Sequence, residues 1–469
     1  MLFSLIMLLS SLKTGPAFLK MPFYSGIAFL FAASVFIVVC YKINILSKIN
    51  SKAFLVALTL TALIPRLLWI YYVHTQPYSD FLHLHDYGVS VSHGDFKGFI
   101  DFYSAFPFKI GFGMILGGLY HVFGTGILAA KLFNVFLSVM LVLIIYSGGK
   151  MLYGDKAGKI SGLLAALWPA DIMYTSVIAS EHLFLVLFTG ALILILRFVK
   201  DYTYKNYKAS NGNLLLLSIG LLTALAQLIR PMAMLLLPVF AVFVLIYKRY
   251  RAKALETVAL NFKSMLLVIA CYFAVINLVN LPLQSLSGVD VSRTDSGFNL
   301  MIGTNFKSKG MFNNEDFSII AKNNYDIDKI HKEAKQIAFD RIANNPEKLP
   351  RLFADKLEIL WGNENYGYYW STLSARQATP AETWIKSHPR VFQGISQGFY
   401  ILILLMSICT CLYSLRERRY AALIILMVFG GIFFSYMLLE VQSRYHLPVM
   451  PLLILFCTGF LPGTNEYEI

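Results

Sequence analysis

Long apolar segments alternate with short polar segments along most of the chain. A helix needs about 20 apolar residues to cross the hydrocarbon core of a membrane, and eleven segments meet or approach that length. They lie at 23–41, 53–73, 130–148, 159–175, 180–199, 213–229, 232–247, 264–283, 393–414, 420–438 and 447–462. The pattern predicts an all-α, multi-pass membrane protein with about eleven transmembrane helices.

The charges between these segments predict the side on which each connection lies. Five connections are rich in Lys and Arg and poor in acids: 42–52, 149–159, 199–212, 248–263 and 414–419. Basic connections stay in the cytoplasm. The loop 74–129, whose first half is acidic, and the long segment 284–391 are therefore expected on the outer face of the cell membrane.

Segment 110–123 is apolar but short and carries four glycines, so we expect an interfacial helix in the outer loop. If it crossed instead, every later basic connection would lie outside. Three regions follow: an N-terminal bundle (1–283) that includes the outer loop 74–129, an extracytoplasmic insert (284–391) and C-terminal transmembrane helices (392–469). Whether residues 1–22 add a span stays open.

The insert 284–391 differs from the rest in carrying nearly equal numbers of basic and acidic residues. Its apolar positions recur at helical spacing from Asp326 to Ala343. The run Asn345-Pro346-Glu347 is typical of a helix start, and the helix that follows is expected to end at Trp361 and Gly362.

Composition supports the membrane assignment. Of the 469 residues, 57% are hydrophobic and 14% are charged, whereas about a quarter of the residues of a soluble domain are charged. A single soluble enzyme is excluded. The net charge of +14 comes largely from the basic connections and does not indicate a nucleic-acid partner. All five cysteines lie in apolar segments, so we expect free thiols.

Polar groups near the outer ends of membrane spans are functional candidates because they are costly there. Five places stand out: Arg66, the stretch 77–81 with Asp80, Glu181-His182, Arg230-Pro231, and the stretch 440–448 with Arg444 and His446. Asp80 is suited to act as a general base if burial raises its pKa. It is equally suited to cap the helix that follows, and Asp86 is the second carboxylate of the same loop.

The arginines of these stretches are suited to bind phosphate. The planar guanidinium groups of Arg230 and Arg444 match the phosphate oxygens of a lipid carrier, although simple anchoring at the interface explains them as well. Lys109 is a weaker phosphate candidate. Glu181 and His182 are expected to bind a metal, a sugar hydroxyl or each other, and the helix dipole explains Glu181 equally well.

A metal site is a further possibility in the outer loop. Its histidines, His83, His85 and His93, have no diagnostic ligand spacing with Asp80 or Asp86. The sequence identifies no cofactor and leaves a divalent cation open.

Several of these motifs resemble one family when they are taken in order. They are Gln76–Phe81, Phe106-Pro107-Phe108-Lys109, Ser180-Glu181, Ile229-Arg230-Pro231, Ile302–Asn305, Lys356 with Trp361, and Ser443–Pro448. Their order, with a long outer insert before the last three spans, resembles GT-C glycosyltransferases of the protein O-mannosyltransferase and aminoarabinose transferase type. The resemblance covers nearly the whole chain.

The resemblance implies an inverting transfer of a sugar from a polyprenyl-phosphate donor to a hydroxyl of a cell-envelope glycan, lipid or protein, on the outer membrane face. It implies that Asp80 is the catalytic base. Arg230 and Arg444, assisted by Lys109 or His446, would neutralise the departing phosphate, and Asn305 and Trp361 would contact the sugar. The alternative is a transporter or flippase of a lipid-linked glycan, and a catalytically inactive scaffold also stays open.

Overall fold

The computed structural model describes residues 2–13, 45–203, 209–246, 254–293, 296–376, 379–417 and 421–461, together with 31–32, 34–35 and 38. The described residues form helices and connecting turns. Six helices are long and apolar enough to cross a membrane, and two shorter apolar helices accompany them. The chain is thus an all-helical, multi-pass membrane protein, as predicted.

The six long helices are α5 (Ser51–Tyr72), α9 (Ile127–Tyr153), α12 (Glu181–Thr203), α13 (Ala209–Ile229), α15 (Ala254–Ser287) and α23 (Pro389–Glu417). The two shorter apolar helices are α14 (Leu236–Ile246) and α24 (Ala421–Leu438). These eight match eight of the predicted spans. The predicted span 23–41 lies outside the described residues, apart from the few positions between 31 and 38.

Two predicted spans are not single long helices. The segment 159–175 is divided between α10 (Asp155–Ala166) and α11 (Pro169–Tyr174), because Pro169 starts a new helix after an extended residue at Trp168. The segment 447–462 holds a 3-10 helix, η4 (Ser443–Val449), and the fully buried helix α25 (Met450–Phe456). Apolar composition alone did not reveal either interruption.

The remaining helices are short. In the first half of the chain they are α1 (Leu2–Lys13), α4 (Ile45–Lys48), α6 (Asp80–Ser92), α7 (Ile100–Ala105), η1 (Pro107–Lys109), α8 (Ile110–Phe123) and η2 (Ala233–Leu235). The insert contains α16 (Ser296–Gly303), α17 (Asn314–Phe317), α18 (Ile319–Lys322), α19 (Ile327–Asn344), η3 (Pro346–Lys348), α20 (Leu349–Trp361), α21 (Tyr366–Leu373) and α22 (Pro380–Ser387). Helices α19 and α20 confirm the two helices predicted there.

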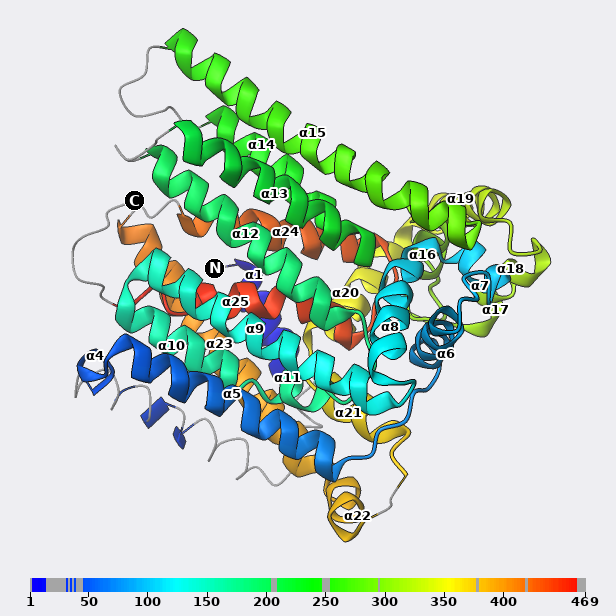
Figure 1. The fold of residues 1–469 in the computed structure, drawn as a ribbon, viewed down its shortest axis with the longest axis horizontal. Coiled ribbons are helices and arrows are strands. Elements are labelled where there is room, and N and C mark those ends of the chain that lie inside the picture. Colours follow the sequence, from blue (N-terminus) through cyan, green and yellow to red (C-terminus); the bar gives the residue numbers. More distant parts are fainter. Residues whose placement is uncertain are drawn as a thin grey trace.

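Several of the short helices gather at one end of the bundle. Helices α6, α7 and α8 lie there together with α16 to α19, as Figure 1 shows. A small apolar core joins the two groups, with Phe106 of the first loop packed against Phe298 of α16. The first loop and the helices α16 to α19 of the insert thus form one layer over the ends of the long helices.

The bundle core contains a buried ion pair. The guanidinium of Arg66 on α5 lies 2.7 Å from Asp171 Oδ2 on α11 and donates to Ser138 on α9. Both charged side chains are almost fully buried. The attraction between them offsets the cost of removing each charge from water. Arg66, one of the five stretches singled out in the sequence, thus links three helices of the core.

Candidate active site

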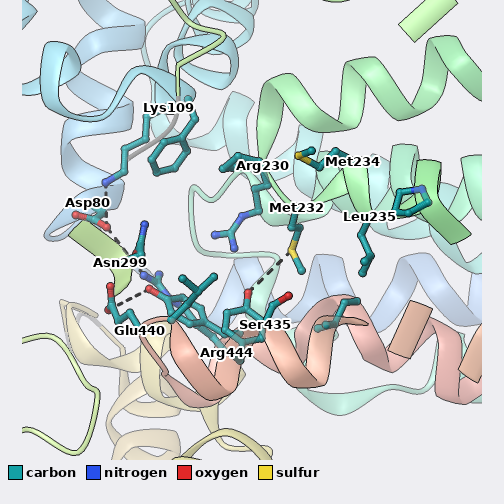
Figure 2. Close-up of a pocket in the computed structure, with 17 residues that line it drawn as sticks. Asp80, Lys109, Arg230, Met232, Met234, Leu235, Asn299, Ser435, Glu440 and Arg444 are labelled. Atoms are coloured by element: carbon teal, nitrogen blue, oxygen red, sulfur yellow. Dashed lines mark hydrogen bonds and ion pairs between the residues drawn. The ribbon is translucent and has the colours of Figure 1, made fainter. Parts of the chain in front are cut away.

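A cavity of about 490 Å³ lies where the end layer meets the bundle. Segments far apart in the chain contribute its charged side chains and a carboxamide: Asp80 of α6, Lys109 of η1, Arg230 after α13, Asn299 of α16, and Glu440 and Arg444 after α24. Figure 2 shows Asp80, Lys109, Glu440 and Arg444 on one side of the cavity, with Met232, Met234 and Leu235 on the other.

Asp80 lies in the first turn of α6, and the backbone immediately before it is strained. Ser79, the N-cap residue, has φ 54° and ψ −132°, and its side chain makes no capping hydrogen bond. A non-glycine residue with positive φ is unfavourable, and such strain concentrates at functional sites. Asp80 is therefore not the N-cap residue, and the strained turn points its carboxylate to the cavity.

Two cations lie near this carboxylate. Lys109 Nζ lies 3.1 Å from Asp80 Oδ2, and the Arg444 guanidinium lies 4.0 Å from the same oxygen. The ammonium of Lys109 holds the pKa of the Asp80 carboxyl below its usual value, despite the opposing effect of desolvation. The raised pKa that would suit a general base is therefore absent in the empty cavity. With 46% of its side chain exposed, Asp80 stays accessible to a ligand.

Arg444 is buried and held by aromatic rings. Its guanidinium carbon lies 4.9 Å from the centre of the Trp370 ring, 5.0 Å from Phe81 and 5.6 Å from Tyr445. Arginine stacks well on aromatic faces because its planar charge is weakly hydrated. Its Nε has no hydrogen-bond partner among the described residues. The charge is thus fixed in place by stacking.

Arg230 is held from the bundle side. Its guanidinium donates to Glu181 Oε1 at 2.6 Å, and the Tyr174 hydroxyl donates to the same oxygen at 3.1 Å. Arg230 Nε, like that of Arg444, has no partner in the described part of the chain. Glu181 is one of the predicted site residues, and the geometry gives it the role of orienting Arg230.

The opposite wall of the cavity is apolar. It is lined by side chains of η2, α14 and α24 and by the residues next to them: Met232, Met234, Leu235, Pro238, Ile432 and Leu439. A cluster of positive charge therefore adjoins an apolar surface that continues between two membrane-type helices. An anionic head attached to a hydrocarbon chain fits both parts.

Four predicted site residues lie away from this cavity in buried clusters, and two of them, His446 and Trp361, stack on each other. His446 Nε2 shares a hydrogen bond with the Glu364 carboxyl group, and its Nδ1 lies 2.6 Å from the carbonyl oxygen of Leu360. His182 Nδ1 lies 3.6 Å from Asp171 Oδ1. Asn305 donates to Asp316 Oδ2 at 2.9 Å, and Trp361 stacks on Phe433.

Asp86, the second carboxylate of the outer loop, also does not line the cavity, although it shares α6 with Asp80. Of the predicted set, the structure brings together Asp80, Lys109, Arg230 and Arg444 directly, and Glu181 through Arg230.

Asn299 and Glu440 line the cavity but were not selected as site residues from the sequence. Asn299 lies on α16, inside the insert, where one asparagine among many carries no distinguishing signal. Glu440 belongs to the singled-out stretch 440–448, but its spacing from Arg444 alone did not indicate that both face the same cavity. The only available signal was its position at the end of an apolar span.

The described residues contain no group of three or more His, Cys, Asp or Glu side chains arranged to hold a metal ion. The cavity itself carries two carboxylates with three basic side chains, a set better suited to an anion than to a divalent cation.

Comparisons with known proteins give distant structural matches only. No family model matches the chain, and no curated protein matches it in sequence. The structure of ArnT from Cupriavidus metallidurans bound to undecaprenyl phosphate aligns at 13% identity and a TM-score of 0.34, over 88% of this chain and 77% of that chain.

An archaeal oligosaccharyltransferase gives a similar result. The Archaeoglobus fulgidus oligosaccharyltransferase in complex with Zn and sulfate aligns at 13% identity and a TM-score of 0.37. The complex of AglB from the same organism with an inhibitory peptide and a dolichol-phosphate aligns at 11% identity and a TM-score of 0.37. Each alignment covers 88% of this chain and little more than half of the other, 54% and 56%. Values this low do not assign the chain to a family.

Proposed function

We propose that this protein is an inverting glycosyltransferase of the GT-C type. It moves a sugar from a polyprenyl-phosphate carrier to an acceptor hydroxyl. The observation that carries the proposal is the cavity, in which one accessible carboxylate, three cations and an apolar wall meet. The sequence motifs that resemble this family supply four of these residues, Asp80, Lys109, Arg230 and Arg444.

The donor's phosphate would lie among Lys109, Arg230 and Arg444. Guanidinium groups bind phosphate through paired hydrogen bonds, and both arginines line the cavity. The polyprenyl chain would follow the apolar wall between α14 and α24, where Leu235 and Ile432 line the cavity. Fixed cations of this kind stabilise charge that develops on a leaving group.

Asp80 would act as the general base. The acceptor oxygen forms a bond to C1 of the sugar as the bond from C1 to the phosphate oxygen breaks. The acceptor proton goes to Asp80, and the electron pair of the broken bond stays on the polyprenyl phosphate. In the empty cavity Lys109 weakens Asp80 as a base. A bound phosphate would attract Lys109 and so raise the proton affinity of Asp80 for the chemical step.

The reaction would take place on the outer face of the membrane. Helix α9 is continuous from Ile127, next to α8, to Tyr153, so Lys150 and the Lys156 and Lys159 of α10 lie at the end of the bundle opposite the cavity. Basic segments of this kind favour the cytoplasmic side. Outside the cell, a lipid-phosphate sugar is an available donor, and the acceptor would be an envelope glycan, lipid or protein.

The test is a transfer assay with the purified protein in lipid nanodiscs and a panel of polyprenyl-phosphate sugars. Asp80→Asn is expected to lower the transfer rate about 100-fold or more, because general-base catalysis contributes at least that much, while polyprenyl phosphate still binds. Asp328→Asn, an exposed aspartate of α19, is the control with an unchanged rate. If Asp80→Asn transfers sugar as fast as wild type, Asp80 is not the base. Translocation of the lipid without any transfer would support the flippase alternative.

A further inference from the structure

The cavity holds a second carboxylate, Glu440, to which the proposed reaction gives no role. Glu440 is 7% exposed and lines the cavity beside Asn299, on the same side as Asp80. Its Oε1 accepts hydrogen bonds from Gln442 Nε2 at 3.0 Å and from the Tyr445 hydroxyl at 3.2 Å. The carboxylate is thus oriented through one oxygen, and no described residue donates a hydrogen bond to the other oxygen.

The backbone around Glu440 is fixed to the insert. The Glu440 amide donates to the Asn299 carbonyl at 2.9 Å, and the next amide, Val441, donates to Gly310 at the same distance. The buried ammonium of Lys356 donates hydrogen bonds to two backbone carbonyls. One belongs to Gly303, the last residue of α16, and the other to Met437 in the last turn of α24. Asn299 and Glu440 therefore keep a constant position relative to each other.

The two carboxylates of the cavity differ in their electrostatics. Burial raises the pKa of Glu440, against the opposing effects of Gln442, Arg444 and Tyr445, whereas Lys109 lowers the pKa of Asp80. Carboxylates on one site whose pKa values move in opposite directions have different roles. Asp80 stays a charged acceptor, and Glu440 is the group that can bind a neutral, hydroxyl-rich ligand at low electrostatic cost.

We propose that Glu440 and Asn299 form the subsite that binds the hydroxyl groups of the donor sugar. The inference rests on the proposed glycosyltransferase function. A carboxyl and a carboxamide supply the acceptors and donors that vicinal hydroxyls need, and both lie in the same cavity as Asp80 and the basic cluster. The sugar would then lie between the phosphate and Asp80. This subsite replaces Asn305 and Trp361, which lie away from the cavity.

The test compares two affinities, those for bare polyprenyl phosphate and for the sugar-loaded carrier. A panel of polyprenyl-phosphate glucose, mannose and N-acetylglucosamine is first assayed for turnover, and the donor that wild type uses fastest is taken forward. Glu440→Ala is expected to weaken binding of that donor about tenfold or more, the effect of losing hydrogen bonds to a carboxylate. Glu440→Ala should bind bare polyprenyl phosphate with the same affinity as wild type. That result would also show that the variant is folded.

The variants separate the possible outcomes. Glu440→Gln keeps the size and should lose less donor affinity than Glu440→Ala, while Glu347→Ala, an exposed residue of η3, should change neither affinity. Equal donor affinity in wild type and Glu440→Ala would overturn this subsite and leave the proposed function intact. A wild-type protein that binds neither ligand and turns over no donor would overturn the proposed function itself.

Discussion

At the scale of single residues, the decisive contact is the one between Asp80 and Lys109. A distance of 3.1 Å from Nζ to Oδ2 makes this an ion pair that lowers the pKa of Asp80. Asp80 is therefore charged throughout the neutral range in the empty cavity. The sequence identified both residues, but it did not reveal that they are partners, because the residues that separate them belong to three short helices.

This pairing predicts a change in pH dependence. In Lys109→Met the pKa of Asp80 rises, because its main electrostatic stabilisation is lost, so the acid limb of the pH profile of kcat/KM moves to higher pH. Transfer by wild type should fall only at a pH below the ordinary value for an aspartate. The control is Lys97→Met, an exposed lysine of the same loop, whose profile should match wild type. An acid limb that stays in place in Lys109→Met would show that Lys109 does not control Asp80.

At the scale of elements, the insert is connected to the bundle through a close backbone contact. A Cβ at Gly303, at the end of α16, would lie 2.1 Å from the carbonyl oxygen of Leu438 at the end of α24. No side chain fits there without moving the backbone. The same contact brings Asn299 of α16 to Glu440, so the shape of the cavity depends on the absence of a side chain at this glycine.

Gly303→Ala is therefore expected to destabilise the protein by about 1–3 kcal/mol, the usual cost of overpacking, and to weaken donor binding. Gly118→Ala is the matched control: a Cβ on this helical glycine of α8 meets nothing within 4 Å. It should leave stability unchanged or raise it by up to about 1 kcal/mol. Unfolding midpoints in detergent measure both. Equal midpoints for the two variants would show that the contact between α16 and α24 is not tight.

Some elements were predictable and others were not, for physical reasons. The helices α19 and α20 were predicted because helical spacing and a proline-containing start are local signals. The break between α10 and α11 was missed because the segment was read by its mainly apolar composition, although Pro169, which starts α11, is a local signal of a helix boundary. The buried pair of Asp171 with Arg66 could not be predicted, because the two residues are more than a hundred positions apart. Contacts of this range leave no periodic pattern in a sequence.

At the scale of the whole molecule, one cavity collects side chains from α6, η1, α16 and the ends of α13 and α24. The convergence of Asp80, Arg230 and Arg444 was predicted because all three were expected near span ends that face the same side of the membrane. Membership of the cavity was less predictable. His446 shares a motif with the cavity residue Arg444, and Asn305 lies near Asn299 in the chain, yet each points into a separate hydrogen-bonded cluster.

The central claim is that this cavity binds the phosphate of a lipid carrier. The most direct measurement is the affinity of polyprenyl phosphate for the purified protein and for Arg230→Gln, Arg444→Gln and the control Arg293→Gln, an exposed arginine at the same end of the molecule. We expect each cavity variant to lose about tenfold or more in affinity, the effect of one lost charge-assisted hydrogen bond, and the control to bind as wild type does. Equal affinity in all four proteins would contradict the account.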